Sequence, residues 1–308
     1  MKWKTFFSFF GILLFIYVLF KLNLVVVFQE IKNSNWGFIF LAISLVGFLL
    51  ITQTIKWHVI ARKQKMKISF IESFKINLIS GFYGFVTPSK MGTLIRADYL
   101  KKYSKDMGKG LANFVLDKIL DIISVFLIFF IFFIKFKEKF SFVPILLFVA
   151  IFCGLILISL LIFKKNLINP ILSFLLEKIA PKKIKEKIKM NFKTFHDDIP
   201  DKKYLPLFLF LNIFNWILTY FITFIVGLAV GVNLNFIYFL AILPISTLIS
   251  LIPITINGIG TREITLISLF ALFGISSEKV FSMSIINILI ANILPSITAI
   301  FLILKNKR

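Results

Sequence analysis

The chain has 308 residues, 59% of them hydrophobic, and its mean hydropathy is +0.95. This composition excludes a soluble globular protein and indicates an all-α integral membrane protein. The net charge of +22 comes without a basic stripe on a soluble face, so it favours the cytoplasmic side of a membrane over a nucleic-acid partner.

Six continuous apolar runs are long enough for the ~20 residues with which a helix crosses about 30 Å of hydrocarbon. The first run lacks a small-x-small cleavage site, so we expect a retained span rather than a signal peptide. The predicted transmembrane helices lie near residues 5–28, 36–56, 111–134, 141–163, 204–230 and 281–304.

Two further apolar runs, 69–88 and 237–275, are broken by Pro and Gly. If each run enters and leaves on the same side of the membrane, 27 Lys and Arg residues lie inside and 5 lie outside. This split follows the positive-inside rule and places both termini in the cytoplasm. The sequence therefore favours two re-entrant broken helices, and the alternative is that both runs cross the membrane.

An internal repeat follows from this topology. The order span, span, re-entrant helix, span occurs over 5–134 and again over 141–304. Because each unit has an odd number of crossings, the second is inverted relative to the first, an arrangement common in transporters. Both units place Gly-x-x-x-Arg after a proline: Pro88, Gly92 and Arg96 in TPSKMGTLIR, and Pro253, Gly258 and Arg262 in PITINGIGTR. We predict a single membrane domain over 1–308.

Residues 164–203 form the longest predicted cytoplasmic segment. Within this segment LINPILSFLLEKIA and PKKIKEKIKMNF alternate apolar and basic residues at helical spacing. Such a pattern is typical of an amphipathic helix that lies on the cytoplasmic leaflet, and a solvated charged linker is the alternative. In either case the segment separates the two repeats.

Ionisable residues inside apolar runs mark the candidate site, because each costs about 2.5–3.5 kcal/mol near the bilayer centre unless it faces a partner or a cavity. Asp117 and Asp121 share a helix face, and Lys118 is placed to reach Asp121. A local ion pair between Asp117 and Lys118 in the headgroup region is the alternative. Arg262 and Glu263 point about 100° apart on a helix, so we expect each to have a partner elsewhere, and the two aspartates are available.

Each broken run also contains a signal for the start of a helix. Thr87 before Pro88 fits an N-cap followed by the first helical position. In the second run Asn257 before Gly258 fits a cap for the helix that follows. A helix N-terminus presents unpaired N–H groups and the positive end of a dipole, which together bind anions.

Cations next to these predicted helix starts complete a candidate phosphate site. Lys90 and Arg96 follow the first cap, and Arg262 follows the second. Four glycines allow the backbone to approach a headgroup closely or, as the alternative, allow tight packing between helices. They are Gly84, Gly92, Gly258 and Gly260.

Motifs of soluble enzymes are absent from the sequence, among them a P-loop, a Rossmann fingerprint and a G-x-S-x-G elbow. The single cysteine, Cys153, excludes an intrachain disulfide, and His58 and His196 are far apart. We therefore predict no metal site, no cofactor and no catalytic residue.

Three stretches resemble the membrane domain of the lysylphosphatidylglycerol synthases, also called the flippase-like domain: GFVTPSKMGTLIRADYLKK, LDKILDIISVFL and LIPITINGIGTREITLISLFALFGIS. The resemblance covers most of the chain and implies an integral membrane protein that moves a polar-headed lipid between leaflets. Nothing in this chain resembles the cytosolic domain with which the synthases make their lipid, so lipid synthesis is not expected. The chain departs from the family pattern at Lys90, Thr93 and Ile256-Asn257, which alters the charge near the site.

The sequence thus supports the hypothesis of a lipid flippase in the cell membrane. Arg96 and Arg262 would bind a phosphate, while Asp117, Asp121 and Glu263 would pair with them in the empty state or receive a cationic headgroup or a proton. The expected partners are an anionic phospholipid or a lipid-linked glycan. The alternatives are a membrane-embedded enzyme or accessory subunit that acts on such lipids, with the carboxylates as acid and base, and a scaffold for a partner enzyme.

Overall fold

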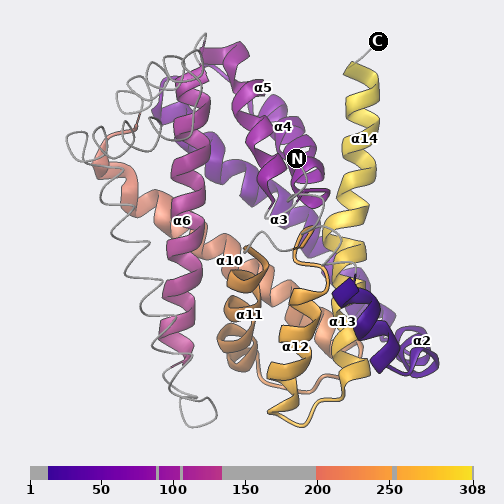
Figure 1. The fold of residues 1–308 in the computed structure, drawn as a ribbon. Helices are drawn as coiled ribbons and strands as arrows, with labels where there is room; N and C mark the ends of the chain where they lie inside the picture. Colours follow the sequence, from indigo (N-terminus) through magenta and orange to yellow (C-terminus); the bar gives the residue numbers. More distant parts are fainter. Residues whose placement is uncertain (1–12, 88–89, 105–106, 134–198, 252–254, 307–308) are drawn as a thin grey trace, which may run out of the picture.

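The computed structural model describes residues 13–87, 90–104, 107–133, 199–251 and 255–306, and the regular elements in these ranges are helices. The all-α prediction is therefore confirmed for the described part of the chain (Figure 1). Pro88, Pro253, the predicted span 141–163 and most of the predicted loop 164–203 lie outside the described residues.

The N-terminal apolar run bends sharply within its described part. A helix over Leu13–Lys21 and helix α2 (Leu24–Lys32) meet at an angle of 85°. Asn23 lies at the bend, and its side-chain oxygen accepts two amides of the first turn of α2, at 3.1 and 3.3 Å. Because asparagine is among the best N-cap residues, it starts a new helix here. The run predicted to span the membrane over 5–28 is therefore bent in its described part.

Three described stretches are long and apolar enough to cross a membrane, and the bent N-terminal pair would make a fourth. The three stretches match the predicted spans 36–56, 204–230 and 281–304. The stretches are α3 (Trp36–Lys63), η3 (Lys202–Tyr204) with α10 (Leu205–Ala229), and the series α13 (Ser277–Ile288), η4 (Leu289–Ile293) and α14 (Leu294–Asn306). Pro295 follows the π-helical η4, where its missing N–H and its ring widen the helix.

Each predicted break separates two helices, which we call a broken pair; the second break lies inside the run 237–275, whereas the first follows the helix of the run 69–88. The helices of the first are α4 (Phe70–Phe85) and, after the short η1 (Met91–Leu94), α5 (Ile95–Ser104); those of the second are α11 (Phe236–Leu251) and α12 (Thr261–Ala271). Figure 1 shows α4 and α5 at one end of the molecule and α11 and α12 at the other, while α6 (Met107–Phe133) packs against both α5 and α11. The two breaks therefore face the middle of the molecule from opposite ends.

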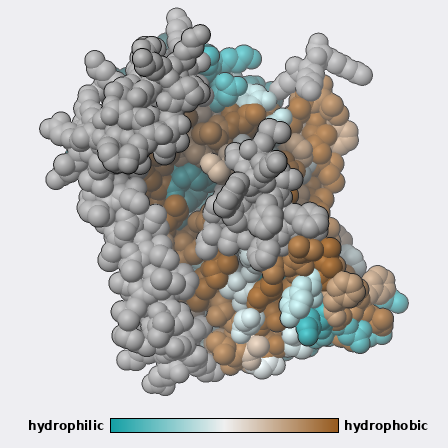
Figure 2. Space-filling model, viewed as in Figure 1, coloured by the Kyte–Doolittle hydropathy of each residue, from teal (hydrophilic) through white to brown (hydrophobic). Residues whose placement is uncertain are grey.

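The hydrophobic core is centred on α10. The largest cluster joins α10 to α3, α11, α12 and α13 and contains Phe239 and Phe270, and a second cluster around Trp57 joins α3, α4 and α5. Other large hydrophobic side chains stay exposed, including Phe20 at 86% and Phe301 at 67%. Figure 2 shows one such hydrophobic face, interrupted by a small hydrophilic area. Extended apolar surface of this kind suits contact with lipid.

Candidate functional site

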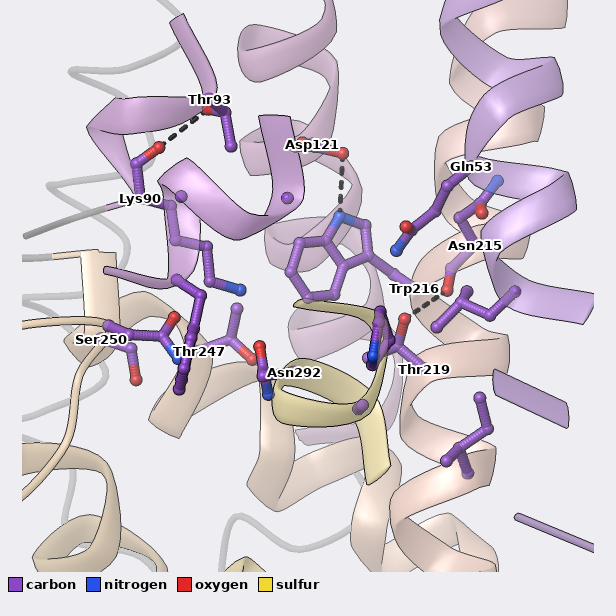
Figure 3. A pocket seen from close by; sticks show the side chains of 18 of the residues that line it. Gln53, Lys90, Thr93, Asp121, Asn215, Trp216, Thr219, Thr247, Ser250 and Asn292 are labelled. Atoms are coloured by element: carbon purple, nitrogen blue, oxygen red, sulfur yellow. Dashed lines mark hydrogen bonds between the residues drawn. The ribbon is translucent and has the colours of Figure 1, made fainter. Parts of the chain in front are cut away.

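A cavity of about 340 Å³ lies where the two breaks face each other. Gly84 and Lys90 border it from the first broken pair, and Ser250, Asn257 and Arg262 border it from the second. Parts of α3, α6, α10, α13, η4 and α14 complete the wall. Residues that are far apart in the sequence thus surround one space, which both polar and apolar side chains line (Figure 3).

Three cations and two carboxylates form a chain of ion pairs along one wall of this cavity. Asp117 accepts from the Arg96 guanidinium at 2.7 Å through Oδ2, and its Oδ1 lies 3.0 Å from Lys56 Nζ as an ion pair. Lys56 Nζ also contacts Asp121 at 2.6 Å, and Asp121 accepts from Lys118 Nζ at 3.0 Å. We call these five residues the ion-pair network. Except for Lys118, its members are at most 9% exposed. Because little water reaches these charges, the opposite charges of the network stabilise one another.

The network depends on how three helices pack. Lys56 comes from α3, Arg96 from α5 and the aspartates from α6. Asn113 joins α6 to α3, because its Nδ2 donates to the Trp57 carbonyl at 3.2 Å and to the Gln64 side chain at 3.1 Å. The Arg96 guanidinium also lies 5.2 Å from the centre of the Trp57 ring, within range of a cation–π contact.

The predicted contact between Lys118 and Asp121 is confirmed. The alternative of a local pair between Asp117 and Lys118 was wrong, because adjacent side chains diverge by about 100° and Asp117 is directed toward α3 and α5. Sequence reasoning also missed Lys56, which lies at the end of the predicted span 36–56 and was not among the candidate residues. The available signal was its position within an apolar run that has the length of a span.

Arg262 and Glu263 satisfy each other, contrary to the expectation that each has a partner elsewhere. Glu263 is fully buried, and its Oε1 accepts from Arg262 Nε at 3.1 Å, from Arg262 Nη2 at 2.9 Å and from the Ser284 hydroxyl at 2.8 Å. Its Oε2 accepts the Gly260 amide at 2.6 Å. The carboxylate turns back to cap α12, and the long guanidinium folds onto it from the neighbouring position. The aspartates of α6 are paired with other cations instead.

The two predicted caps have different outcomes. Thr87 Oγ1 accepts the amide of Gly92 at 2.7 Å in the first turn of η1, although Lys90 occupies the N-cap position itself. Asn257 does not cap α12: the helix begins after Gly260, whose φ of 91° suits glycine. Asn257 has φ 50° and is 3% exposed, and its Oδ1 has no hydrogen-bond partner within the described ranges.

Three of the predicted glycines serve close packing within the broken pairs. A Cβ on Gly92 would collide with the Tyr83 carbonyl oxygen, one on Gly84 with Thr93, and one on Gly258 with Ser250. These contacts favour tight packing, the alternative raised from the sequence, as the reason for glycine at these positions.

Lys90 extends into the cavity and has no ion-pair partner in the part of the chain that the structure describes (Figure 3). By contrast, Arg96, Lys56, Lys118 and Arg262 are each bound to a carboxylate. Described ionisable residues at or directly behind the wall comprise five cations and three carboxylates, an excess of two positive charges. Such a cavity attracts anions.

Comparison with known proteins assigns the chain to a family. Residues 6–299 match the family model of the lysylphosphatidylglycerol synthase TM region. The chain belongs to this family. Similar curated proteins are UPF0104 membrane proteins from Pyrococcus horikoshii and Methanocaldococcus jannaschii, which are 22% and 23% identical over 298 residues. The match to the Pyrococcus horikoshii protein covers 90% of this chain and 89% of that protein. The match to the Methanocaldococcus jannaschii protein covers 92% of this chain and 88% of that protein.

Membership of the lysylphosphatidylglycerol synthase TM region family confirms the sequence resemblance and agrees with the apolar helices in indicating a multi-pass membrane protein. A UPF0104 membrane protein from Methanothermobacter thermautotrophicus is 30% identical over 118 residues, 37% of this chain and 34% of that protein. Within the described residues no group of three or more His, Cys, Asp or Glu side chains is arranged to hold a metal ion. The cavity with its ion-pair network is the candidate site of this family member.

Proposed function

We propose that this member of the lysylphosphatidylglycerol synthase TM region family moves a phosphate-bearing, polar-headed lipid between the leaflets of the cell membrane. The observation that carries the proposal is the cavity between the two breaks, which has excess positive charge inside a molecule with hydrophobic outer faces. A lipid phosphate is an anion that must cross hydrocarbon, and a cationic cavity lowers the cost of that crossing.

In this proposal the two broken pairs are re-entrant and belong to inverted repeats, with both termini in the cytoplasm. This arrangement is supported by the positions of the two pairs, which lie at opposite ends of the molecule with their breaks toward the middle (Figure 1). A cavity bordered by both breaks opens toward one leaflet when one pair moves and toward the other leaflet when the second pair moves. When the two pairs move one after the other, a single headgroup site becomes accessible from each leaflet alternately.

Lys90 binds the phosphate first because no carboxylate competes for it among the described residues. Lys118 and Arg262, at the edge of the same cavity, complete the anion site. Phosphate oxygens that accept from Lys118 compete with Asp121, which weakens the contact between Lys118 and the network. Cargo binding thereby loosens the pairing around the first break and permits that pair to move.

The test is lipid movement in vesicles that contain the purified full chain and phosphatidylglycerol labelled on its acyl tail. Lys90→Met should slow movement about tenfold or more, since hydrogen bonds to charged groups contribute about 1.5–3 kcal/mol. Lys203→Met, at a 68% exposed side chain that pairs with Asp201 on the surface, is the matched control and should leave the rate unchanged. Wild-type rates from Lys90→Met would overturn the site, and covalent change of the lipid would identify an enzyme instead.

A further inference from the structure

The wall of the cavity combines two kinds of polar side chain. Lys90, Lys118 and Arg262 provide cations, and Gln53, Asn287 and Asn292 provide uncharged amides. Figure 3 shows Gln53, Thr219 and Asn292 around the same space as the end of the Lys90 side chain. We propose that the headgroup continues beyond its phosphate as an uncharged, hydroxyl-rich group, such as glycerol, inositol or a sugar. This inference rests on the proposed function and specifies its cargo.

The carboxylates do not offer a site for an amine. Asp117 already binds Arg96 and Lys56, and Asp121 binds Lys56 and Lys118. Glu263 accepts from Arg262, Ser284 and a backbone amide. An ammonium group would add positive charge to a cavity that already has an excess of it, next to carboxylates that are each paired with a cation. The earlier expectation that these carboxylates receive a cationic headgroup therefore has no support from the described geometry.

The amides have capacity left for a ligand. Gln53 and Asn292 have no side-chain hydrogen bond inside the described ranges, and Asn287 uses its Nδ2 on Thr223 at 3.3 Å, with no partner recorded there for its oxygen. Asn257 adds a buried Oδ1 without a partner at the same cavity. An amide side chain both donates and accepts, and among headgroup groups only a hydroxyl does the same, because a phosphate oxygen accepts and an ammonium donates. The pattern fits several neighbouring hydroxyls.

Trp216 adds an apolar surface of suitable shape. Its ring borders the cavity, and its Nε1 donates to Asp121 Oδ1 at 3.3 Å, which fixes the orientation of the ring (Figure 3). A tryptophan combines a broad apolar face with one polar group, so it packs against the C–H face of a ring whose hydroxyls point to the amides. The hydroxyl-rich group therefore lies beside Trp216, with the phosphate toward Lys90.

The experiment measures binding of short-chain lipids to the purified full chain in detergent, with lipid movement followed in parallel. The probes are dioctanoyl phosphatidylinositol, phosphatidylglycerol, phosphatidic acid, lysylphosphatidylglycerol and phosphatidylethanolamine. The inositol and glycerol lipids should bind about tenfold more tightly than phosphatidic acid and than both amine lipids, the equivalent of one or two additional hydrogen bonds. Equal binding of phosphatidic acid, or tighter binding of an amine lipid, would overturn the inference.

Single substitutions distinguish the role of the amides from that of the cations. Asn292→Leu and Gln53→Leu should each reduce the preference for the inositol and glycerol lipids while leaving the affinity for phosphatidic acid unchanged. Gln29→Leu, at an exposed position on α2, is the matched control and should leave both affinities unchanged. Asn292→Ala repeats the test with a smaller side chain if the leucine variant does not fold. An unchanged preference in both folded Asn292 and Gln53 variants would refute the assignment of these amides.

Two further outcomes separate this inference from the proposed function. Lipid movement without a preference among headgroups would leave the transport proposal intact and overturn the inference. Selective binding without movement of any lipid would support the inference about the cavity and overturn transport. Free glycerol 3-phosphate should bind at least tenfold more weakly than the lipids, because it lacks the apolar chains. If glycerol 3-phosphate binds as tightly as the lipids, the cavity recognises a hydroxyl-rich phosphate compound, and the claim that this compound is a lipid headgroup is overturned.

Discussion

Asp117→Asn perturbs the ion-pair network at its most buried member. Asp117 is 1% exposed, accepts from Arg96 at 2.7 Å and forms an ion pair with Lys56 at 3.0 Å, and these cations are 5% and 6% exposed. Replacing the carboxylate by a neutral amide leaves the Arg96 guanidinium without an anion. Removing one partner of a buried ion pair costs about 3–5 kcal/mol, so we expect a loss of that size in the free energy of unfolding.

Lys56→Met is the informative comparison because it removes charge from the same network with the opposite sign. Asp117 then keeps Arg96 and Asp121 keeps Lys118, so each carboxylate retains one cation. The three cations and two carboxylates become two of each. We expect this variant to lose less than about 2 kcal/mol, since it gives up hydrogen bonds to charged groups but also avoids the burial of an ammonium.

The assay is thermal unfolding of the detergent-purified full chain, followed by intrinsic tryptophan fluorescence. At roughly 2–4 °C per kcal/mol, Asp117→Asn should lower Tm by about 6–20 °C. The exposed Asp201→Asn, which removes a surface pair with Lys203, should leave Tm unchanged. If Asp117→Asn unfolds at the same temperature as Lys56→Met, the carboxylate does not compensate two buried cations and the reasoning fails.

Further predictions concern the breaks and the cavity. Gly92→Ala should lower Tm because its Cβ collides with a backbone carbonyl of α4, whereas Gly47→Ala, which meets open space, should not; equal Tm values would contradict the described packing. Glu263→Ala should cost about 3–5 kcal/mol of unfolding free energy, because α12 loses its cap and Arg262 its anion; an unchanged unfolding midpoint would refute this pairing. Lys90→Met should unfold within about 1 °C of the wild type despite slower lipid movement, because no described pair is lost.

Many features of the fold followed from the sequence. Long apolar runs specify spans because backbone polar groups in hydrocarbon must be satisfied within a helix, and α3 and α10 lie where such runs were predicted. The second break fell where Pro and Gly interrupt an apolar run, and the first fell where the run 69–88 ends in a proline. The bend at Asn23 was missed, because a hydropathy window does not register a single capping residue.

Most of the residues of the candidate site could be predicted from the sequence, but only some of the contacts between them could. Arg96, Asp117 and Asp121 stood out because charges in apolar runs are costly, and they border one cavity. Sequence spacing gave the contact between Lys118 and Asp121, since both lie on one helix. It did not give Lys56, whose partners are separated from it by more than 60 positions along the chain.

The sequence by itself determined that this chain is a helical membrane protein, where its apolar runs break and which charged residues require a partner, because these properties depend on composition and local spacing. Only the tertiary structure decided the pairing. The packing of α3, α5 and α6 brings Lys56 and Arg96 to the same aspartate, and Glu263 turns back onto Gly260 and Arg262. Charge compensation depends on distance in space, and that distance is set by which helix faces meet.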